Sequence, residues 1–213
     1  MQYEKKYAWS WLLRLYHWAM VLSIVFLTFT GLYIDHPVTS SLTGGGTFPM
    51  ADMRYLHFLA AFVFTGAVIA RLYLALFGNR QENIFSLLRR LPENIVDAWR
   101  SLLNYLYISD YEHPGLGHNG LATIVYCFTF LLAMLQIFSG FYLLLPENLF
   151  WQGWGLSVFG SPQSARLIHY LSMWYFMTFA AVHVYIIVWN EIKHPEGMLS
   201  AMLGGYKFKP RKA

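Results

Sequence analysis

Four histidines lie inside long apolar segments of this 213-residue chain: His17, His57, His169 and His183. An ionisable side chain in the apolar core of a membrane is costly, so it marks a candidate functional site. One such histidine is explained equally well by a hydrogen bond to a neighbouring helix. Four together favour a chemical role, because imidazole nitrogens are ligands for haem iron and for metal ions.

The positions of these histidines group them into two pairs. His183 follows His169 by 14 residues, which in an α-helix is a rise of about 21 Å and nearly four full turns, so the two share a face. If alternate segments cross the membrane in opposite directions, His57 falls at the depth of His169, and His17 at the depth of His183. Two imidazoles at each of two depths indicate two stacked bis-histidine haems.

Arginines accompany the histidines in a repeated pattern. Three of the nine arginines lie three residues before one of the four histidines: Arg14, Arg54 and Arg166. Residues three apart share a helix face, so each guanidinium can pair with a haem propionate one turn nearer the water. Arg71 follows His57 by 14 residues, which places it at the depth of the inner pair. It could bind the propionates of the inner haem or a quinone. The alternative is that these side chains extend to the lipid headgroups.

Zinc is the alternative metal. A tetrahedral zinc site needs three or four ligands at one depth, whereas the sequence predicts two imidazoles at each level. The single cysteine, Cys127, excludes a disulfide framework, a cysteine zinc site and Cys-ligated iron–sulfur clusters. No C-x-x-C-H motif is present for covalent haem attachment.

The composition indicates that lipid surrounds most of the chain. Hydrophobic residues make up 57% and charged residues 12%, against about 25% charged in soluble proteins. Four segments are long and apolar enough to cross a bilayer: residues 12–33, 55–77, 121–145 and 168–189. We therefore predict an all-α fold, an integral membrane four-helix bundle forming a single domain over 1–213.

Basic residues predict the orientation of this bundle. Most of the 15 Lys and Arg lie before the first segment, between the second and third, and after the fourth. The positive-inside rule then places both termini in the cytoplasm. The net charge of +4 is thus explained by orientation, and no nucleic-acid partner is expected.

Residues 94–107, in the long cytoplasmic loop, have helical periodicity. Ile95, Trp99 and Leu106 share one face, and Asp97 and Arg100 lie away from it. The pattern predicts a helix lying in the membrane interface or, equally, an ordinary connecting helix.

Several motifs resemble the b-type cytochrome subunit of membrane-bound nickel–iron hydrogenases, over nearly the whole chain. These motifs are Arg14-Leu15-Tyr16-His17-Trp18 followed by Thr30-Gly31, Arg166-Leu167-Ile168-His169 with Trp174 and His183, the stretch 71–80, Gly117-His118-Asn119, and Gly205-Tyr206-Lys207. Cytochrome subunits of formate dehydrogenase and thiosulfate reductase share the plan. Tyr170 departs from the pattern, because relatives often have a second basic residue there.

The resemblance implies a bacterial inner-membrane protein with two haem b groups. It implies that the hydrogenase large and small subunits lie on the periplasmic side, with a transmembrane helix of the small subunit beside this chain. Electrons from the iron–sulfur clusters would reach the outer haem (His57, His169), then the inner haem (His17, His183), and finally a quinone near the cytoplasmic face.

His118 and Asn119 are the candidate quinone contacts, because they precede the third segment at its cytoplasmic end. The alternative for Asn119 is an N-cap of that helix. Other functions stay open at this point. The same role for another dehydrogenase, a free-standing cytochrome b561, and a haem-free transporter are the alternatives, although no Asp or Glu lies inside the four segments.

Overall fold

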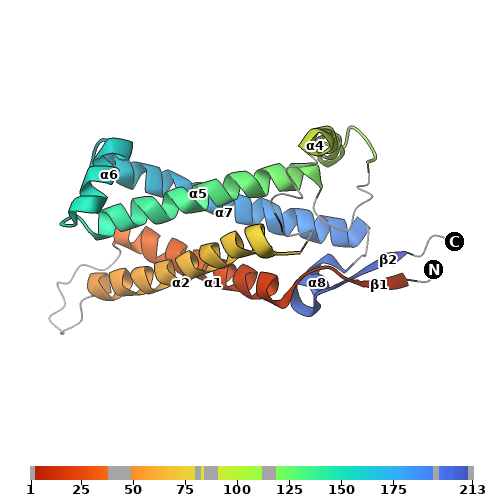
Figure 1. The fold of residues 1–213 in the computed structure, drawn as a ribbon, viewed down its shortest axis with the longest axis horizontal. Coiled ribbons are helices and arrows are strands. Elements are labelled where there is room, and N and C mark those ends of the chain that lie inside the picture. The colour runs from red at the N-terminus through yellow and green to blue at the C-terminus, as the bar shows by residue number, and fades with distance from the viewer. Residues whose placement is uncertain are drawn as a thin grey trace. The chain divides into compact units, whose positions relative to one another are not determined.

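The computed structural model describes residues 3–37, 49–79, 83, 91–111, 119–193 and 197–210. Four long helices make up most of it: α1 (Trp11–Asp35), α2 (Pro49–Phe77), α5 (Gly120–Leu144) and α7 (Pro162–Lys193) (Figure 1). Among the described residues, these four are long and apolar enough to cross a membrane. The predicted all-α membrane fold is confirmed.

Helices α1, α2 and α7 are longer than the predicted apolar segments, whereas α5 keeps the predicted length and begins one residue earlier. Both α2 and α7 begin earlier than the sequence predicted, at Pro49 and Pro162. Proline is favoured at the first position of a helix, because that position needs no N–H donor. The additional first turns contain polar residues such as Asp52 and Gln163, which an apolar window does not detect.

Shorter elements complete the described chain. They are β1 (Tyr3–Tyr7), α4 (Leu91–Tyr105), α6 (Leu149–Phe159), α8 (Met198–Gly204) and β2 (Tyr206–Pro210). Helix α4 corresponds to the predicted amphipathic segment. Its Ile95 and Trp99 side chains are exposed, which suits a helix whose apolar face contacts lipid. The sequence did not predict α6, α8 or the two strands.

Contacts between residues divide the chain into two compact units. Unit 1 contains residues 1–14, 70–132 and 181–213, and unit 2 contains residues 15–69 and 133–180. Each of the four long helices therefore contributes a segment to both units. The assignment of residues 1–213 to one domain stays a prediction.

In unit 2, helix α6 connects the end of α5 to the start of α7 (Figure 1). Aromatic side chains hold it against α5: the rings of Phe141 and Trp151 stack with centroids 5.5 Å apart, and those of Tyr142 and Phe159 stack at 5.9 Å. Asn148 is the N-cap of α6, and its side chain accepts hydrogen bonds from two main-chain N–H groups of the first turn.

In unit 1, the two ends of the chain pair with each other. Strands β1 and β2 are antiparallel, with Tyr7 opposite Tyr206 (Figure 1). Gly205 precedes β2 with φ of 85°, and its carbonyl accepts a hydrogen bond from the Ala8 N–H at 2.8 Å. A side chain at Gly205 would be strained at this φ and would press on the Tyr7 ring, which explains a glycine here.

The packing of α6 makes a testable prediction about stability. A methyl group added at Gly155 would overlap the Tyr142 ring, whereas one added at Gly153 would meet nothing within 4 Å. We expect Gly155→Ala to lower the free energy of unfolding by about 1–3 kcal/mol, the usual cost of overpacking. Gly153→Ala, the control, removes a flexible residue from the same helix and should be neutral or stabilising. Thermal unfolding in detergent measures both, and equal stability of the two variants would contradict this packing.

Candidate functional site

His57, on α2, is held by a hydroxyl of the neighbouring helix α1. The Nδ1 atom of His57 lies 2.9 Å from Oγ1 of Thr30. The Thr30 hydroxyl itself donates to the main-chain carbonyl of Phe26, at 2.6 Å. A carbonyl can only accept, so the hydroxyl hydrogen is used there and Nδ1 of His57 must donate. The tautomer is thereby assigned: the hydrogen is on Nδ1, and Nε2 carries the free lone pair.

His169, on α7, has the same surroundings on helix α5. Its Nδ1 atom lies 2.8 Å from Oγ of Ser139, and that hydroxyl donates to the carbonyl of Gln136 at 3.1 Å. Ser139 is completely buried. The hydrogen of this imidazole is again on Nδ1, and Nε2 is again available to a metal.

A glycine follows each of the two hydroxyl residues, and each imidazole packs against it. A Cβ atom at Gly31 would lie 3.4 Å from Cε1 of His57, and one at Gly140 would lie 3.3 Å from Cε1 of His169. A side chain at either position would therefore crowd the ring, and glycine leaves room for each imidazole to approach the neighbouring helix.

His57 and His169 both belong to unit 2, and each imidazole lies against a hydroxyl group on the long helix before its own. Their pairing as ligands of one outer haem stays a prediction. Among the described residues, no cluster of three or more His, Cys, Asp or Glu side chains could hold a metal ion. Two imidazole nitrogens are a donor set that suits haem iron.

The other two histidines lie in separate units. Nδ1 of His183 is 3.2 Å from the hydroxyl of Tyr126, within unit 1. His17 belongs to unit 2, where its ring and that of Trp18 are nearly perpendicular, with centroids 5.4 Å apart. The pairing of His17 with His183 therefore stays a prediction from their spacing in the sequence.

The four arginines have different surroundings. Arg54 and Arg166 are exposed, one turn before their histidines, and Arg71 is half-buried. An Nη atom of Arg14 donates to the Leu203 carbonyl of α8. The Nε atom of Arg14 is buried without a hydrogen-bond partner in the described part of the chain, so it is a donor that a carboxylate such as a propionate would satisfy.

Asn119 occupies the N-cap of α5. Its side-chain oxygen accepts from the Ala122 N–H at 2.8 Å, and its amide donates to the Tyr105 hydroxyl at 3.1 Å. Both functional groups of the amide are therefore engaged within the protein, as the N-cap alternative requires. His118, the other candidate quinone contact, lies outside the described residues.

Asp97 joins α4 to the start of α5. It accepts hydrogen bonds from the Tyr111 hydroxyl and from the Gly120 N–H. The hydrogen bond to Asp97 raises the pKa of Tyr111, so this phenol stays protonated and remains a donor at neutral pH. The amphipathic helix α4 is thereby attached to a membrane-spanning helix.

Sequence analysis missed the partners of the histidines, although a pattern was present. Thr30-Gly31 and Ser139-Gly140 each lie on the long helix that precedes an Arg-x-x-His motif. A search for hydroxyl–glycine pairs in the first and third segments would have found Ser139. Tyr126, the partner of His183, has no comparable pattern around it.

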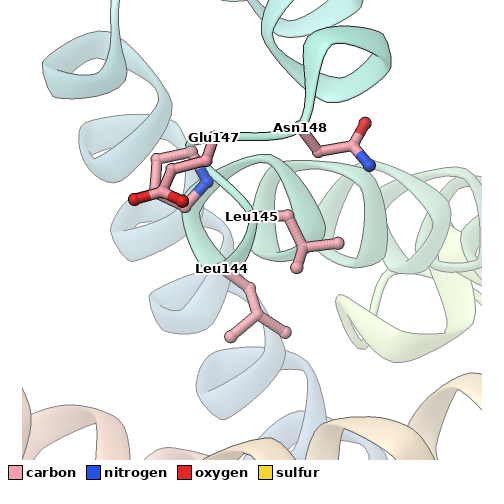
Figure 2. Close-up of a pocket in the computed structure, with 5 residues that line it drawn as sticks. Leu144, Leu145, Glu147 and Asn148 are labelled. Atoms are coloured by element: carbon pink, nitrogen blue, oxygen red, sulfur yellow. The ribbon is translucent and has the colours of Figure 1, made fainter.

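A pocket at the turn between α5 and α6 lies apart from these donor groups. It has a volume of about 500 Å³, and Leu144, Leu145, Pro146, Glu147 and Asn148 line it (Figure 2). None of these side chains is a haem-iron ligand in the predicted scheme, and Asn148 is engaged in capping α6. This pocket therefore adds nothing to the candidate site.

Comparisons with known proteins agree over most of the chain. Residues 8–205 match the family described as prokaryotic cytochrome b561. A protein of Azotobacter vinelandii named "Probable Ni/Fe-hydrogenase B-type cytochrome subunit" is 31% identical over 209 residues, which cover 92% of this chain and 85% of the relative. A protein of Cupriavidus necator with the same name is 30% identical, over 91% of this chain and 83% of the relative. A protein of Escherichia coli K12, named "Probable Ni/Fe-hydrogenase 1 B-type cytochrome subunit", is 28% identical, over 91% of this chain and 87% of the relative. The chain belongs to the prokaryotic cytochrome b561 family.

Proposed function

We propose that this multi-pass membrane cytochrome is the di-haem anchor of a nickel–iron hydrogenase. In this proposal it carries electrons from the periplasmic iron–sulfur clusters of the enzyme, across the bacterial inner membrane, to a quinone. The single observation that carries the proposal is the pair of imidazoles in unit 2, each with Nδ1–H donated to a hydroxyl and Nε2 available to iron. A b-type cytochrome uses that donor set for its haem.

The residues divide between two haem b groups. His57 and His169 would be the axial ligands of the outer haem, and His17 and His183 those of the inner haem. The propionates would pair with the four arginines that accompany the histidines: Arg14, Arg54, Arg71 and Arg166. The unsatisfied Nε of Arg14 supports this assignment most directly.

Two imidazole ligands determine what such a site does. Bound haem b supplies a reversible one-electron couple. His57 and His169 would hold the iron between them and would leave no position on it for a substrate, so the site would be restricted to electron transfer. His183 follows His169 by 14 residues, a rise of about 21 Å in a helix, so the two levels would be separated by most of the apolar thickness of a bilayer.

The quinone would be reduced near the cytoplasmic ends of the helices, where we place its site at the start of α5 around His118 and Asn119. Since Asn119 already caps α5 and binds Tyr105, it would shape this site while His118 contacts the quinone. If the protons come from the cytoplasm, each electron carried inward stores up to about 2.3 kcal/mol per 100 mV of membrane potential.

The names of the relatives support hydrogenase as the electron donor. Three relatives from different genera carry the hydrogenase subunit name at 28–31% identity over at least 91% of this chain. We therefore propose the hydrogenase small subunit, including its transmembrane helix, and the large subunit as partners. The family description also includes cytochrome b561, so a free-standing cytochrome or one serving another dehydrogenase is the second candidate.

The ligand assignment predicts the haem content of single variants. His57→Ala and His169→Ala should each remove one of two haems from the purified protein, because a lone imidazole leaves one axial position empty. Haem per polypeptide, measured by the pyridine haemochrome assay, should fall from two to about one. His36→Ala is the control, since His36 is an exposed residue beside Asp35, and it should keep both haems. Full haem content in either ligand variant would refute the pairing.

The identity of the donor is tested in membranes that contain active hydrogenase. Hydrogen should reduce a b-type absorbance band that disappears when the gene for this chain is deleted, with dithionite giving the fully reduced reference. If dithionite reduces the band and hydrogen does not, the cytochrome has another donor, and the second candidate is correct.

The proposed orientation predicts the behaviour of fusion proteins. Lys5 and Lys6 precede α1, and five basic residues lie from Lys193 to the end of the chain, so both termini should remain in the cytoplasm. Green fluorescent protein fused to the C-terminus should fluoresce, and alkaline phosphatase fused there should be inactive. A phosphatase fusion within the α5–α7 connection should be active, and the reverse pattern would contradict the orientation.

A further inference from the structure

The two helix pairs of unit 2 carry the same arrangement of side chains. In each pair, a hydroxyl of one helix receives the Nδ1–H of a histidine on the other, Thr30 for His57 and Ser139 for His169. Each hydroxyl passes its own hydrogen to a carbonyl three or four residues earlier in its helix. The same series of hydrogen bonds, from imidazole to hydroxyl to main-chain carbonyl, therefore occurs twice with different residues.

We propose that Thr30 and Ser139 are positioning residues that lower the midpoint potential of the outer haem, by accepting the Nδ1–H hydrogen bonds of both axial histidines. This inference rests on the proposed function, which assigns His57 and His169 to one haem. It concerns the electronic effect of two hydroxyls that touch neither the iron nor an electron carrier.

The direction of the effect follows from the hydrogen bonds. A group that accepts a hydrogen bond from the far nitrogen of an imidazole increases the basicity of the nitrogen that binds the metal. A more basic ligand stabilises ferric over ferrous iron and so lowers the potential. Each hydroxyl also donates to a carbonyl, and this strengthens the hydrogen bond that it accepts from the imidazole. Linked hydrogen bonds polarise one another in a medium of low dielectric constant.

Burial and packing keep these two bonds in place. Thr30 is 4% exposed and Ser139 is 0% exposed, so water does not compete for the hydroxyls. A side chain at Gly31 or Gly140 would crowd Cε1 of the ring, so these glycines leave room for each imidazole to reach its acceptor. Both ligands of the haem would therefore receive the same contribution.

The inner haem should not share this contribution fully. His183 faces the phenol oxygen of Tyr126 at 3.2 Å, which is a longer contact than those of the outer pair at 2.8 and 2.9 Å. Changes at Thr30 or Ser139 should therefore move one of two midpoint potentials and leave the other in place.

The test is a potentiometric titration of the purified di-haem protein, following the α-band. At the wild-type midpoint of the outer haem, Thr30→Val and Ser139→Ala should each raise the ratio of reduced to oxidised haem at least about threefold. That ratio corresponds to a positive shift of about 28 mV at 59 mV per tenfold for one electron. The double variant should shift further, and the inner potential should not change. His57→Ala, which retains the inner haem alone, identifies the inner component.

Two variants serve as matched controls. Thr30→Ser retains the hydroxyl and should restore the wild-type potential. Ser23→Ala removes another buried hydroxyl of α1, which donates only to the Met20 carbonyl at 3.0 Å, and should move neither potential. If the valine at position 30 hinders haem insertion, Thr30→Ala removes the same hydroxyl without adding a methyl group against the ring.

An outer potential that stays the same or falls in Thr30→Ala and Ser139→Ala, with both haems bound, would overturn the inference. A shift of equal size in Ser23→Ala would also overturn it, because the effect would then reflect packing. Failure of the proposed function gives a different result: His57→Ala would retain two haems. The inference alone fails if His57→Ala loses one haem while the hydroxyl variants leave its potential unchanged.

Discussion

The hydrogen bond from a buried imidazole to a buried hydroxyl is the interaction on which the candidate site depends. An imidazole among apolar helices loses its hydration, and each of its nitrogens then needs a partner. Thr30 and Ser139 satisfy Nδ1 of His57 and His169, which leaves only the Nε2 atoms to be satisfied from outside the chain. In the proposed function, haem iron would satisfy both Nε2 atoms, and this would connect the fold to electron transfer.

The lipid environment explains the remainder of the packing. Large apolar side chains such as Phe29 and Phe77 are exposed, which would be unfavourable in water but is expected where hydrocarbon is the solvent. Small side chains are instead among the most buried, including Ala133, Ser139 and Ala165, because close approach of helices replaces the hydrophobic effect as the source of cohesion. Small residues therefore serve both purposes: they pack helices together, and they would surround a flat cofactor.

The tails and connecting helices hold the ends of the spans. Arg14 is bound to the carbonyl of Leu203, and the β1–β2 pair begins directly beside Gly205. Arg14 is thus fixed by the C-terminal segment three residues before His17. Helix α6 has the corresponding role in unit 2, where stacked aromatic rings join it to the α5 segment that carries Ser139. Elements outside the apolar segments thereby position the residues within them.

The sequence by itself determined the class of the protein, because four apolar segments, their intramembrane histidines and the basic residues between them are properties of composition and spacing. It also predicted the grouping of His57 with His169, since helical rise converts residue number into depth. Only the tertiary structure decided which atoms hold those rings, because Thr30 and Ser139 reach them from other helices, 27 and 30 residues away along the chain. The hydrogen bond from Arg14 to the Leu203 carbonyl of α8 also could not be predicted, because 189 residues separate the two partners along the chain. Spacing predicts depth and face within one helix, but contacts between helices depend on how side chains from distant parts of the chain pack together.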